Sequence, residues 1–199
     1  MKKQTIVIDR EYGSGGREVA RILSRKLGVR FYDGELLALA SEKYGIDLGT
    51  MKDYDEKRFG SLLYSLAMAA NCTNDYEKLE MPYKIYSAQA KLMRQLVAEG
   101  PCIFLGRCAG EILKEETPIL NVFVYSDDIK KKINRIARLD GVKERDAQSR
   151  IHKKDAERQN YYHYFTKKEW GNRQNYDLCL NTSTLGYERA ADAVIAAMR

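Results

Sequence analysis

Five short apolar runs divide this chain, and longer segments with helical spacing lie between them. The runs cover residues 5–9, 29–32, 102–105, 119–125 and 178–180. After the first run, apolar residues recur on one helix face at Val19, Ile22, Leu23 and Leu27, and Gly28 marks the end of that helix. Strands that are apolar throughout and separated by helices are typical of a parallel sheet covered on both faces. The pattern predicts a three-layer α/β/α fold with a five-stranded parallel sheet.

Further helices are predicted from the same spacing and from residues typical of helix ends. They begin near Leu36 or cover residues 61–70, 83–99 and 188–198. Ser126, with Asp127 and Asp128 behind it, has the residue type and charges of a helix N-cap. One long polar helical region is predicted to run from there to about Lys168.

Right-handed connections bring the carboxyl ends of parallel strands to one edge of the sheet, where open α/β sheets bind their ligands. The loops expected at that edge are 10–16, 33–34, 106–107 and the turn at Ser126. The chemistry of the protein is therefore predicted to lie in these loops.

The chain length of 199 residues predicts a single domain with a core of adequate size. Within it we expect a helical substrate-binding insertion at about 44–99 and a basic helical lid at about 140–170. No apolar run approaches the roughly 18 residues of a membrane span, and Ile6-Val7-Ile8 is too short for a secretory signal. We therefore expect no membrane association and a cytoplasmic protein.

Cysteine and histidine usage gives no support to a metal or hydrolase site. The four cysteines contain no CxxC pair, and only two histidines occur, His152 and His163. A zinc site and a Ser-His-Asp or Cys-His hydrolase are therefore disfavoured, and the cysteines are interpreted as buried free thiols.

The net charge of +6 is concentrated in one segment. Between residues 127 and 169 there are 13 Lys and Arg against 8 Asp and Glu. Such a balance suits nucleic acid, acidic lipid or a phosphorylated small molecule, and composition does not choose among them.

The loop after the first strand has the composition of a phosphate site. Gly13, Gly15 and Gly16 allow consecutive backbone N–H groups to turn inward, and the following helix adds partial positive charge. Arg17 adds a cation at the helix start, and Ser14 adds a hydroxyl. We predict that Gly13, Ser14, Gly15, Gly16 and Arg17 bind a phosphorylated cofactor; the alternative is a glycine turn without a ligand.

This loop departs from the common phosphate-binding pattern GxxxxGK[ST] at three positions. With Gly15 as the second glycine of the pattern, Arg10 stands at the first glycine. Gly16 replaces the lysine, and Arg17 replaces the Ser or Thr that ligates Mg²⁺. An anion site survives these changes more easily than a transfer site, and Arg17 is the candidate for the lost charge.

Several segments resemble the cytidylate kinase-like family, a branch of the nucleoside monophosphate kinases. The loop Asp9-Arg-Glu-Tyr-Gly-Ser-Gly-Gly-Arg-Glu18 keeps the aspartate and two glycines of that family's loop. In the same order as in the family there follow Tyr32-Asp33-Gly34, Gly106-Arg107-Cys108, Asp155-Ala156-Glu157-Arg158 and a turn at 181–188. The common order and spacing carry the resemblance, which covers most of the chain.

The resemblance implies a P-loop kinase fold, ATP with Mg²⁺, and phosphoryl transfer to a nucleoside monophosphate such as CMP. By resemblance, Arg107 holds the acceptor phosphate, and Asp33 and Asp155 belong to the substrate site. Arg158 and Arg150 close over the donor, and no protein metal site is expected.

Arg17, Arg158 and Asp9 are the candidate catalytic residues, because transfer requires aligned phosphates and neutralised charge. Purely structural roles are alternatives for several of the candidate site residues. Arg158 could lie on a solvated helix face, and Asp33 could cap the helix that follows it. Asp9 could orient water on Mg²⁺, accept a hydrogen bond from Arg17 or Arg10, or fix the loop.

Aromatic residues follow the basic segment at Tyr161, Tyr162, Tyr164 and Phe165, with Trp170 nearby. Stacking on a base is one interpretation, and packing is the favoured one.

Three functions compete at this point. The leading one is a nucleotide kinase, and the second is a non-catalytic nucleotide-binding or phosphate-binding module derived from a kinase, favoured by the lost lysine. A nucleic-acid binder is the weakest, because no recognised motif for it occurs. The acceptor and the oligomeric state are left open by the sequence.

Overall fold

A computed structural model describes residues 4–56 and 76–198 of this chain. The helix predicted over 61–70, Cys72 and part of the predicted insertion at 44–99 lie outside the described residues. Among those described, no helix is long and apolar enough to span a membrane.

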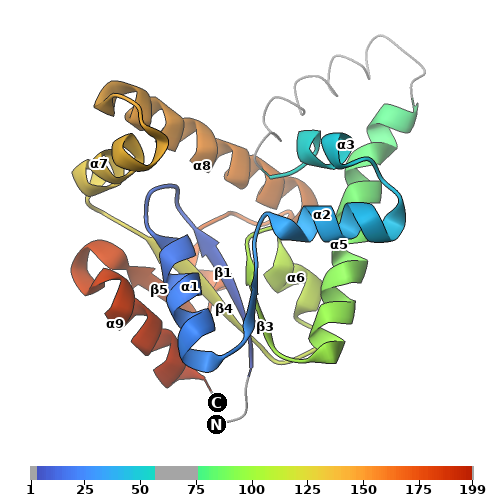
Figure 1. Ribbon diagram of the computed structural model, residues 1–199, viewed down its shortest axis with the longest axis horizontal. Coiled ribbons are helices and arrows are strands. Elements are labelled where there is room, and N and C mark those ends of the chain that lie inside the picture. The colour runs from blue at the N-terminus through green and yellow to red at the C-terminus, as the bar shows by residue number, and fades with distance from the viewer. Residues whose placement is uncertain (1–3, 57–75, 199) are drawn as a thin grey trace.

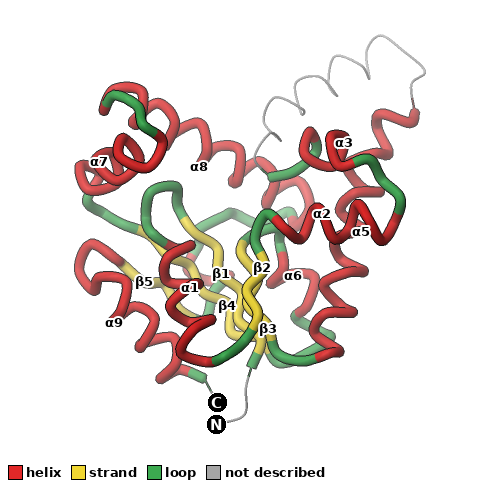
Figure 2. Tube along the Cα trace, viewed as in Figure 1, coloured by secondary structure: helices red, strands yellow, loops and turns green. Residues whose placement is uncertain are grey.

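The five predicted strands form one parallel sheet. The strands are β1 (Thr5–Arg10), β2 (Arg30–Tyr32), β3 (Cys102–Leu105), β4 (Ile119–Tyr125) and β5 (Leu178–Asn181), in the spatial order β2-β3-β1-β4-β5. Every neighbouring pair is parallel, and β1 is buried along its whole length at the centre. Figure 2 shows the strands, in yellow, between helices on both sides.

Alternate residues of β1 point to opposite faces of the sheet and join two different cores. Ile6 and Ile8 pack with residues of α1 (Gly16–Leu27) and α9 (Thr182–Ala197). Val7 packs on the other face, in a second core that includes Tyr32, Leu36 and Phe104. The α/β/α fold and its five-stranded parallel sheet are therefore confirmed, for the physical reason that the apolar runs indicated.

Four helices among the described residues cover the second face. These are α2 (Glu35–Tyr44), α3 (Leu48–Asp53), α5 (Tyr76–Glu99) and α6 (Ala109–Leu113). Leu36, Met51 and Ile85 join three of them in the core. The helix predicted over 83–99 begins earlier in the structure, with Pro82 inside it.

The basic segment forms a helical hairpin over the carboxyl edge of the sheet (Figure 1). The long polar helical region predicted from Ser126 consists of two helices: α7 (Ile129–Asp140) ends at Gly141, and α8 (Glu144–Thr166) begins after it. Gly141 has a φ of 65°, the left-handed conformation that stops helices. The N-cap is Asp128 rather than Ser126, because its side chain accepts from the Lys131 amide.

Two smaller predictions have mixed outcomes. Cys102 and Cys108 are buried and free, but Cys179 is exposed, so the interpretation of buried thiols is wrong for that residue. The aromatic residues pack as favoured: Tyr161 and Tyr162 are buried with Cys108, and Phe165 and Trp170 lie against them. A short 3₁₀ turn (Arg173–Asn175) leads into β5.

Candidate functional site

The loop between β1 and α1 adopts a conformation that its glycines require. Gly13 and Gly15 have φ values of 84° and 86°, in the left-handed region that other residues rarely adopt. A side chain at Gly15 would also collide with the ring of Tyr187. A Cβ on Gly16 would lie 2.5 Å from the Cβ of Arg10. The glycine content is therefore explained by close packing as well as by backbone conformation.

The N-terminus of α1 carries no capping side chain. The first amides of a helix have no partner within it, so an uncapped N-terminus offers donors and partial positive charge to an anion. Ser14 does not take part in this. Its hydroxyl is buried and lies 2.8 Å from the Glu11 carbonyl and 3.0 Å from the Val124 carbonyl, so the ligand-facing hydroxyl predicted for it is wrong.

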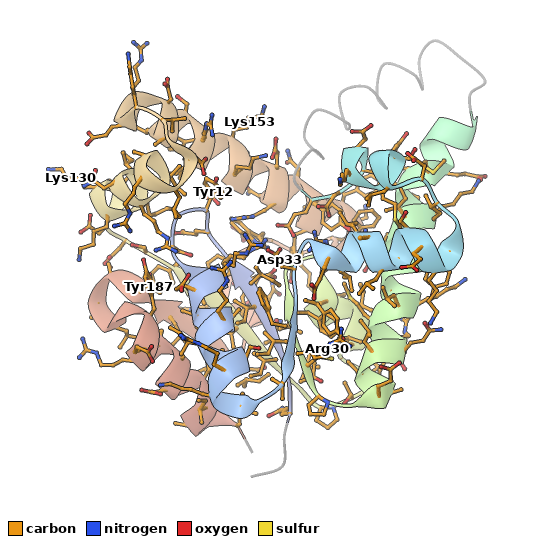
Figure 3. All side chains as sticks on the ribbon, in the orientation of Figure 1. Tyr12, Arg30, Asp33, Lys130, Lys153 and Tyr187 are labelled. Atoms are coloured by element: carbon orange, nitrogen blue, oxygen red, sulfur yellow. The ribbon has the colours of Figure 1, made fainter. Side chains whose placement is uncertain are left out.

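A cavity of about 390 Å³ opens at this loop. Its walls combine loop glycines with arginines from several elements, including Arg10, Arg17, Arg135 and Arg158. The cavity lies between the glycine loop, α1 and the α7–α8 hairpin. Figure 3 shows Tyr12 between the loop and the hairpin and Tyr187 beside α1.

Glu56 joins two of these arginines below the loop. Its Oε1 accepts from Arg10 Nη1 at 2.9 Å and from Arg158 Nε at 3.1 Å. Its Oε2 accepts from the Arg107 amide at 3.0 Å. Burial by itself raises the pKa of Glu56, but the three guanidinium groups outweigh it and lower that pKa to about 2. The Glu56 carboxylate is therefore charged at any ordinary pH.

Arg158 is buried, so the alternative of a solvated helix face is wrong. Its Nη1 also donates to the Arg10 carbonyl at 2.9 Å. Arg158 lines the cavity that the glycine loop forms, on the side of the α7–α8 hairpin. This position is consistent with the donor role predicted for it, which stays a prediction.

Arg107 follows β3 in a left-handed conformation and is fully buried. Its Nε and Nη2 donate to the two carboxylate oxygens of Asp55 at 3.1 and 3.0 Å, and Nη1 donates to the Asp33 carbonyl at 3.0 Å. The predicted contact with an acceptor phosphate stays a prediction. In this structure the guanidinium of Arg107 is paired with the Asp55 carboxylate.

Asp33 lies across the cavity from the hairpin, beside the start of α2. Its Oδ2 pairs with Arg17 Nη2 at 2.7 Å, while the Arg17 side chain is 58% exposed. Among described residues, Asp33 Oδ1 accepts no hydrogen bond. The N-cap of α2 is Gly34, without a side-chain cap, so the capping interpretation of Asp33 is wrong.

The α7–α8 hairpin is attached to the glycine loop by acidic side chains. Asp155 Oδ1 accepts from the Tyr12 amide at 2.6 Å, and its Oδ2 lies 3.5 Å from Lys132 Nζ. Asp155 therefore lies at the glycine loop rather than beside Asp33. Its predicted role in the substrate site stays a prediction.

Arg150 lies farther out on α8. It pairs with Asp140 at 2.9 Å, is 49% exposed, and does not line the cavity. Asp140 also accepts from the Tyr12 hydroxyl at 3.0 Å. The predicted cofactor contact of Arg150 stays a prediction.

Asp9 is the next-to-last residue of β1 and is buried, and its Oδ2 accepts from the Tyr176 hydroxyl at 3.0 Å. The expected hydrogen bond from Arg17 or Arg10 is replaced by this one. Burial, and then the charge of Glu56, raise the pKa of Asp9 to about 6. The Asp9 carboxyl group therefore gains or loses its proton at pH values near 6, whereas Glu56 stays ionised there.

The site gives poor support to a protein-held Mg²⁺. The position of the usual Ser or Thr is Arg17, the Ser14 hydroxyl is committed to carbonyls, and Glu11 Oε2 pairs with Lys132 at 2.9 Å. Within the described ranges, no group of three or more His, Cys, Asp or Glu side chains could hold a metal ion. The described residues therefore form no Mg²⁺ site of their own, and the expectation of ATP with Mg²⁺ stays a prediction.

Sequence reasoning missed the acidic residues Asp55 and Glu56 and the aromatic residue Tyr187. The two acidic residues fall in the stretch where the apolar pattern is least regular, and their arginine partners lie 46 to 102 residues away in the sequence. Arg135 donates to the Tyr187 hydroxyl at 2.9 Å and lies over its ring. The one indication in the sequence was Arg10, an arginine at a position where the common phosphate-binding pattern has a glycine.

A model of the cytidylate kinase-like family matches residues 5–184 of the chain. No curated protein matches the sequence.

Among solved structures, an uncharacterized protein from Eubacterium ventriosum is 24% identical, with 98% of this chain and 97% of that one covered and a TM-score of 0.73. A gluconokinase from Sinorhizobium meliloti is 14% identical over 98% and 92% of the two chains, with a TM-score of 0.53. A shikimate kinase from Acinetobacter baumannii is 13% identical over 97% and 91%, with a TM-score of 0.51. At these identities the likeness concerns the fold, which is that of the P-loop kinases.

Proposed function

Because this chain belongs to the cytidylate kinase-like family, we propose that it transfers the γ-phosphoryl group of ATP to a nucleoside monophosphate or a related small phosphate acceptor. Family and fold support a kinase-type phosphotransferase, and CMP is the acceptor to test first. The observation that carries the proposal is the cavity where the uncapped N-terminus of α1 meets arginines from β1, α1 and α8.

The donor phosphates belong at the glycine loop. Gly13, Gly15 and Gly16 line the cavity, and the free amides at the start of α1 suit phosphate oxygens. The Tyr12 amide donates to Asp155, so this carboxylate marks a position that suits an oxyanion. Arg150 belongs to the outer part of the donor site and would reach it only when the hairpin moves.

Transfer requires cations on both sides of the migrating phosphoryl group. Arg17 lies in the first turn of α1 and pairs with Asp33 toward the acceptor side. Arg158 lies on α8, on the opposite side of the cavity. We assign to these two arginines the neutralisation of the transition-state charge. Asp9 has the lesser role of fixing the end of β1 below the loop, through Tyr176.

The acceptor belongs beside Asp33 and Arg107. Asp33 Oδ1 is buried and accepts no hydrogen bond from the described residues, so it can accept one from an acceptor hydroxyl or amine. Arg107 would contact the acceptor phosphate only by exchanging the Asp55 carboxylate for it.

The alternative function is a nucleotide-binding or phosphate-binding module without catalysis. It is favoured by one observation: neither the loop lysine nor the Ser or Thr after it is present. Such a module would be stabilised by ATP through mass action on the native state, without turnover.

Two measurements together separate these functions. ADP formation from ATP would be followed with CMP, UMP, AMP, GMP and their deoxy forms, and the thermal midpoint would be measured with ATP alone. We expect one acceptor to raise the rate by at least about tenfold over background. Background rates with every acceptor, together with stabilisation by ATP, would select the binding module. Neither turnover nor stabilisation would reject both functions.

A further inference from the structure

Two of the departures of the glycine loop from the common pattern meet in space. Arg10 stands at the first glycine of GxxxxGK[ST], and Gly16 stands at the lysine. A Cβ on Gly16 would lie 2.5 Å from the Cβ and 3.0 Å from the Cγ of Arg10, closer than side-chain atoms approach. The structure therefore has room for a side chain at one of these positions only. Relative to the common pattern, the cationic residue and the glycine are therefore exchanged between positions 10 and 16, which contact each other.

The side chain of Arg10 runs from the end of β1 toward Gly106 at the end of β3. A Cβ at Gly106 would collide with the Arg10 guanidinium and with Glu56, so this glycine, too, leaves room for Arg10. Arg10 is 5% exposed and lines the cavity at the glycine loop. Buried arginines are costly unless paired, and Glu56 supplies the pairing at 2.9 Å.

The guanidinium of Arg10 keeps donors available. Hydrogen bonds to described residues account for one of its nitrogens, Nη1, and leave Nε and Nη2. Arg158 shares the same Glu56 oxygen and donates to the carbonyl of Arg10, so the two guanidinium groups are held together. Both line one cavity, and a carboxylate oxygen held between two guanidinium groups has the partners that a phosphate oxygen takes.

We propose that Arg10 is the cation that replaces the missing loop lysine, and that with Arg158 it binds the terminal phosphates of the donor. This inference rests on the proposed function for the identity of the donor. It differs from the role predicted for Arg17, whose guanidinium is largely exposed and pairs with Asp33. Glu56 is a positioning residue that holds Arg10 and Arg158 in register.

The test is a reciprocal exchange in the full chain, with inorganic tripolyphosphate as the probe and calorimetry as the readout. Arg10→Gly removes the cation, and we expect tripolyphosphate affinity to fall by at least about tenfold. Gly16→Lys alone introduces a side chain against Arg10, and we expect a comparable loss. The double variant Arg10→Gly with Gly16→Lys regenerates the common pattern at both positions, and we expect it to return to within about threefold of the parent affinity.

Arg94→Met is the matched control. Arg94 lies on α5 and does not line this cavity, and its side chain is 45% exposed and pairs with Glu116 at 2.7 Å, so we expect a change within about twofold. Circular dichroism of each variant establishes that it is folded. If an exchange variant does not fold, Arg10→Gln decides the matter, because it keeps a hydrogen-bonding side chain toward Glu56 and removes the charge.

Three results would overturn the proposal. These are no tripolyphosphate binding by the parent chain, parent-like affinity in Arg10→Gly or Arg10→Gln, and a folded double variant no better than the single ones. If Arg17→Met loses tripolyphosphate binding and the Arg10 variants keep parent-like affinity, Arg17 rather than Arg10 replaces the loop lysine. The proposed function fails separately: binding that depends on Arg10, without transfer to any acceptor, leaves the Arg10 site in place and rejects catalysis.

Discussion

Two arginine clusters at the carboxyl edge of the sheet use the same residue types in opposite ways. At the end of β3, all three nitrogens of the Arg107 guanidinium donate to Asp55 and to the Asp33 carbonyl. Below the glycine loop, Arg10 and Arg158 share one oxygen of Glu56 and face a cavity. A guanidinium whose three nitrogens all donate within the chain supports the fold, whereas one with unused nitrogens beside a cavity is prepared for an anion.

The comparison separates two halves of the site. On the proposed donor side, Arg10 and Arg158 face the cavity, whereas on the proposed acceptor side Arg107 is paired with the Asp55 carboxylate. The acceptor arginine predicted from the sequence is therefore better prepared for a structural role than for binding. The changes below test this difference, from the largest expected effect to the smallest.

Arg107→Met is expected to reduce the free energy of unfolding by about 3–5 kcal/mol. It leaves the buried Asp55 carboxylate without its partner, and uncompensated buried charges cost about this much. Urea unfolding measures the effect. The paired variant Arg107→Met with Asp55→Leu is expected to recover most of it, and a loss below about 1 kcal/mol in the single variant would show that this cluster does not support the fold.

Asp9→Asn is expected to change how stability depends on pH. The pKa of Asp9 is about 6 in the folded chain, above its ordinary value of 3.8, so the folded state binds the additional proton between these values. Stability from this group is present below about pH 4 and is lost as pH rises through 6. The advantage of the variant over the parent should grow across that range to about 3 kcal/mol.

The measurement is the free energy of unfolding at several pH values for both proteins. Glu56, whose pKa is lowered, acts in the opposite direction below about pH 4.5 in both proteins, so the difference isolates Asp9. A difference that stays constant from pH 4 to pH 7 would contradict the raised pKa.

Arg158→Met is expected to lower kcat/KM for the accepted nucleotide by about a hundredfold, because one cation is lost from the transition state. Lys153→Met is the matched control on the same helix: its side chain is exposed and points away from the sheet (Figure 3), and we expect parent-like rates. Equal rates in both variants would remove Arg158 from the donor side of the comparison.

Gly15→Ala and Gly28→Ala compare two glycines with positive φ. A side chain at Gly15 meets the ring of Tyr187, whereas one at Gly28 meets nothing within 4 Å. We expect losses of unfolding free energy of about 2 kcal/mol and about 1 kcal/mol, and loss of ATP-induced stabilisation only in the first. Thermal melting with and without ATP checks both, and equal effects would mean that the loop packing is unimportant.

Arg150→Met is expected to have the smallest effect. Its ion pair with Asp140 is half exposed, and such pairs contribute little. We expect the KM for ATP to rise by about threefold at constant kcat, through weaker closure of the hairpin over the donor. An unchanged KM would exclude Arg150 from the donor site.

Much of the fold could be predicted from the sequence. The five strands follow from runs of local apolar residues, and the glycine loop follows from three glycines next to the first of these runs. The division of the basic helical region into α7 and α8 was not predicted, because Gly141 interrupts a polar segment whose apolar spacing gives little indication of where one helix ends.

The sequence by itself determined which residue types stand at the loop, including the exchange of arginine and glycine at positions 10 and 16. Only the tertiary structure decided what that exchange means, because the contact between Arg10 and Gly16 depends on the turn of the loop. It also decided which carboxylates meet the arginines: Glu56 lies 46 residues from Arg10 and 102 from Arg158. Pairs so distant in sequence leave no local pattern, because their energy is gained only when the sheet brings the strand ends to one edge.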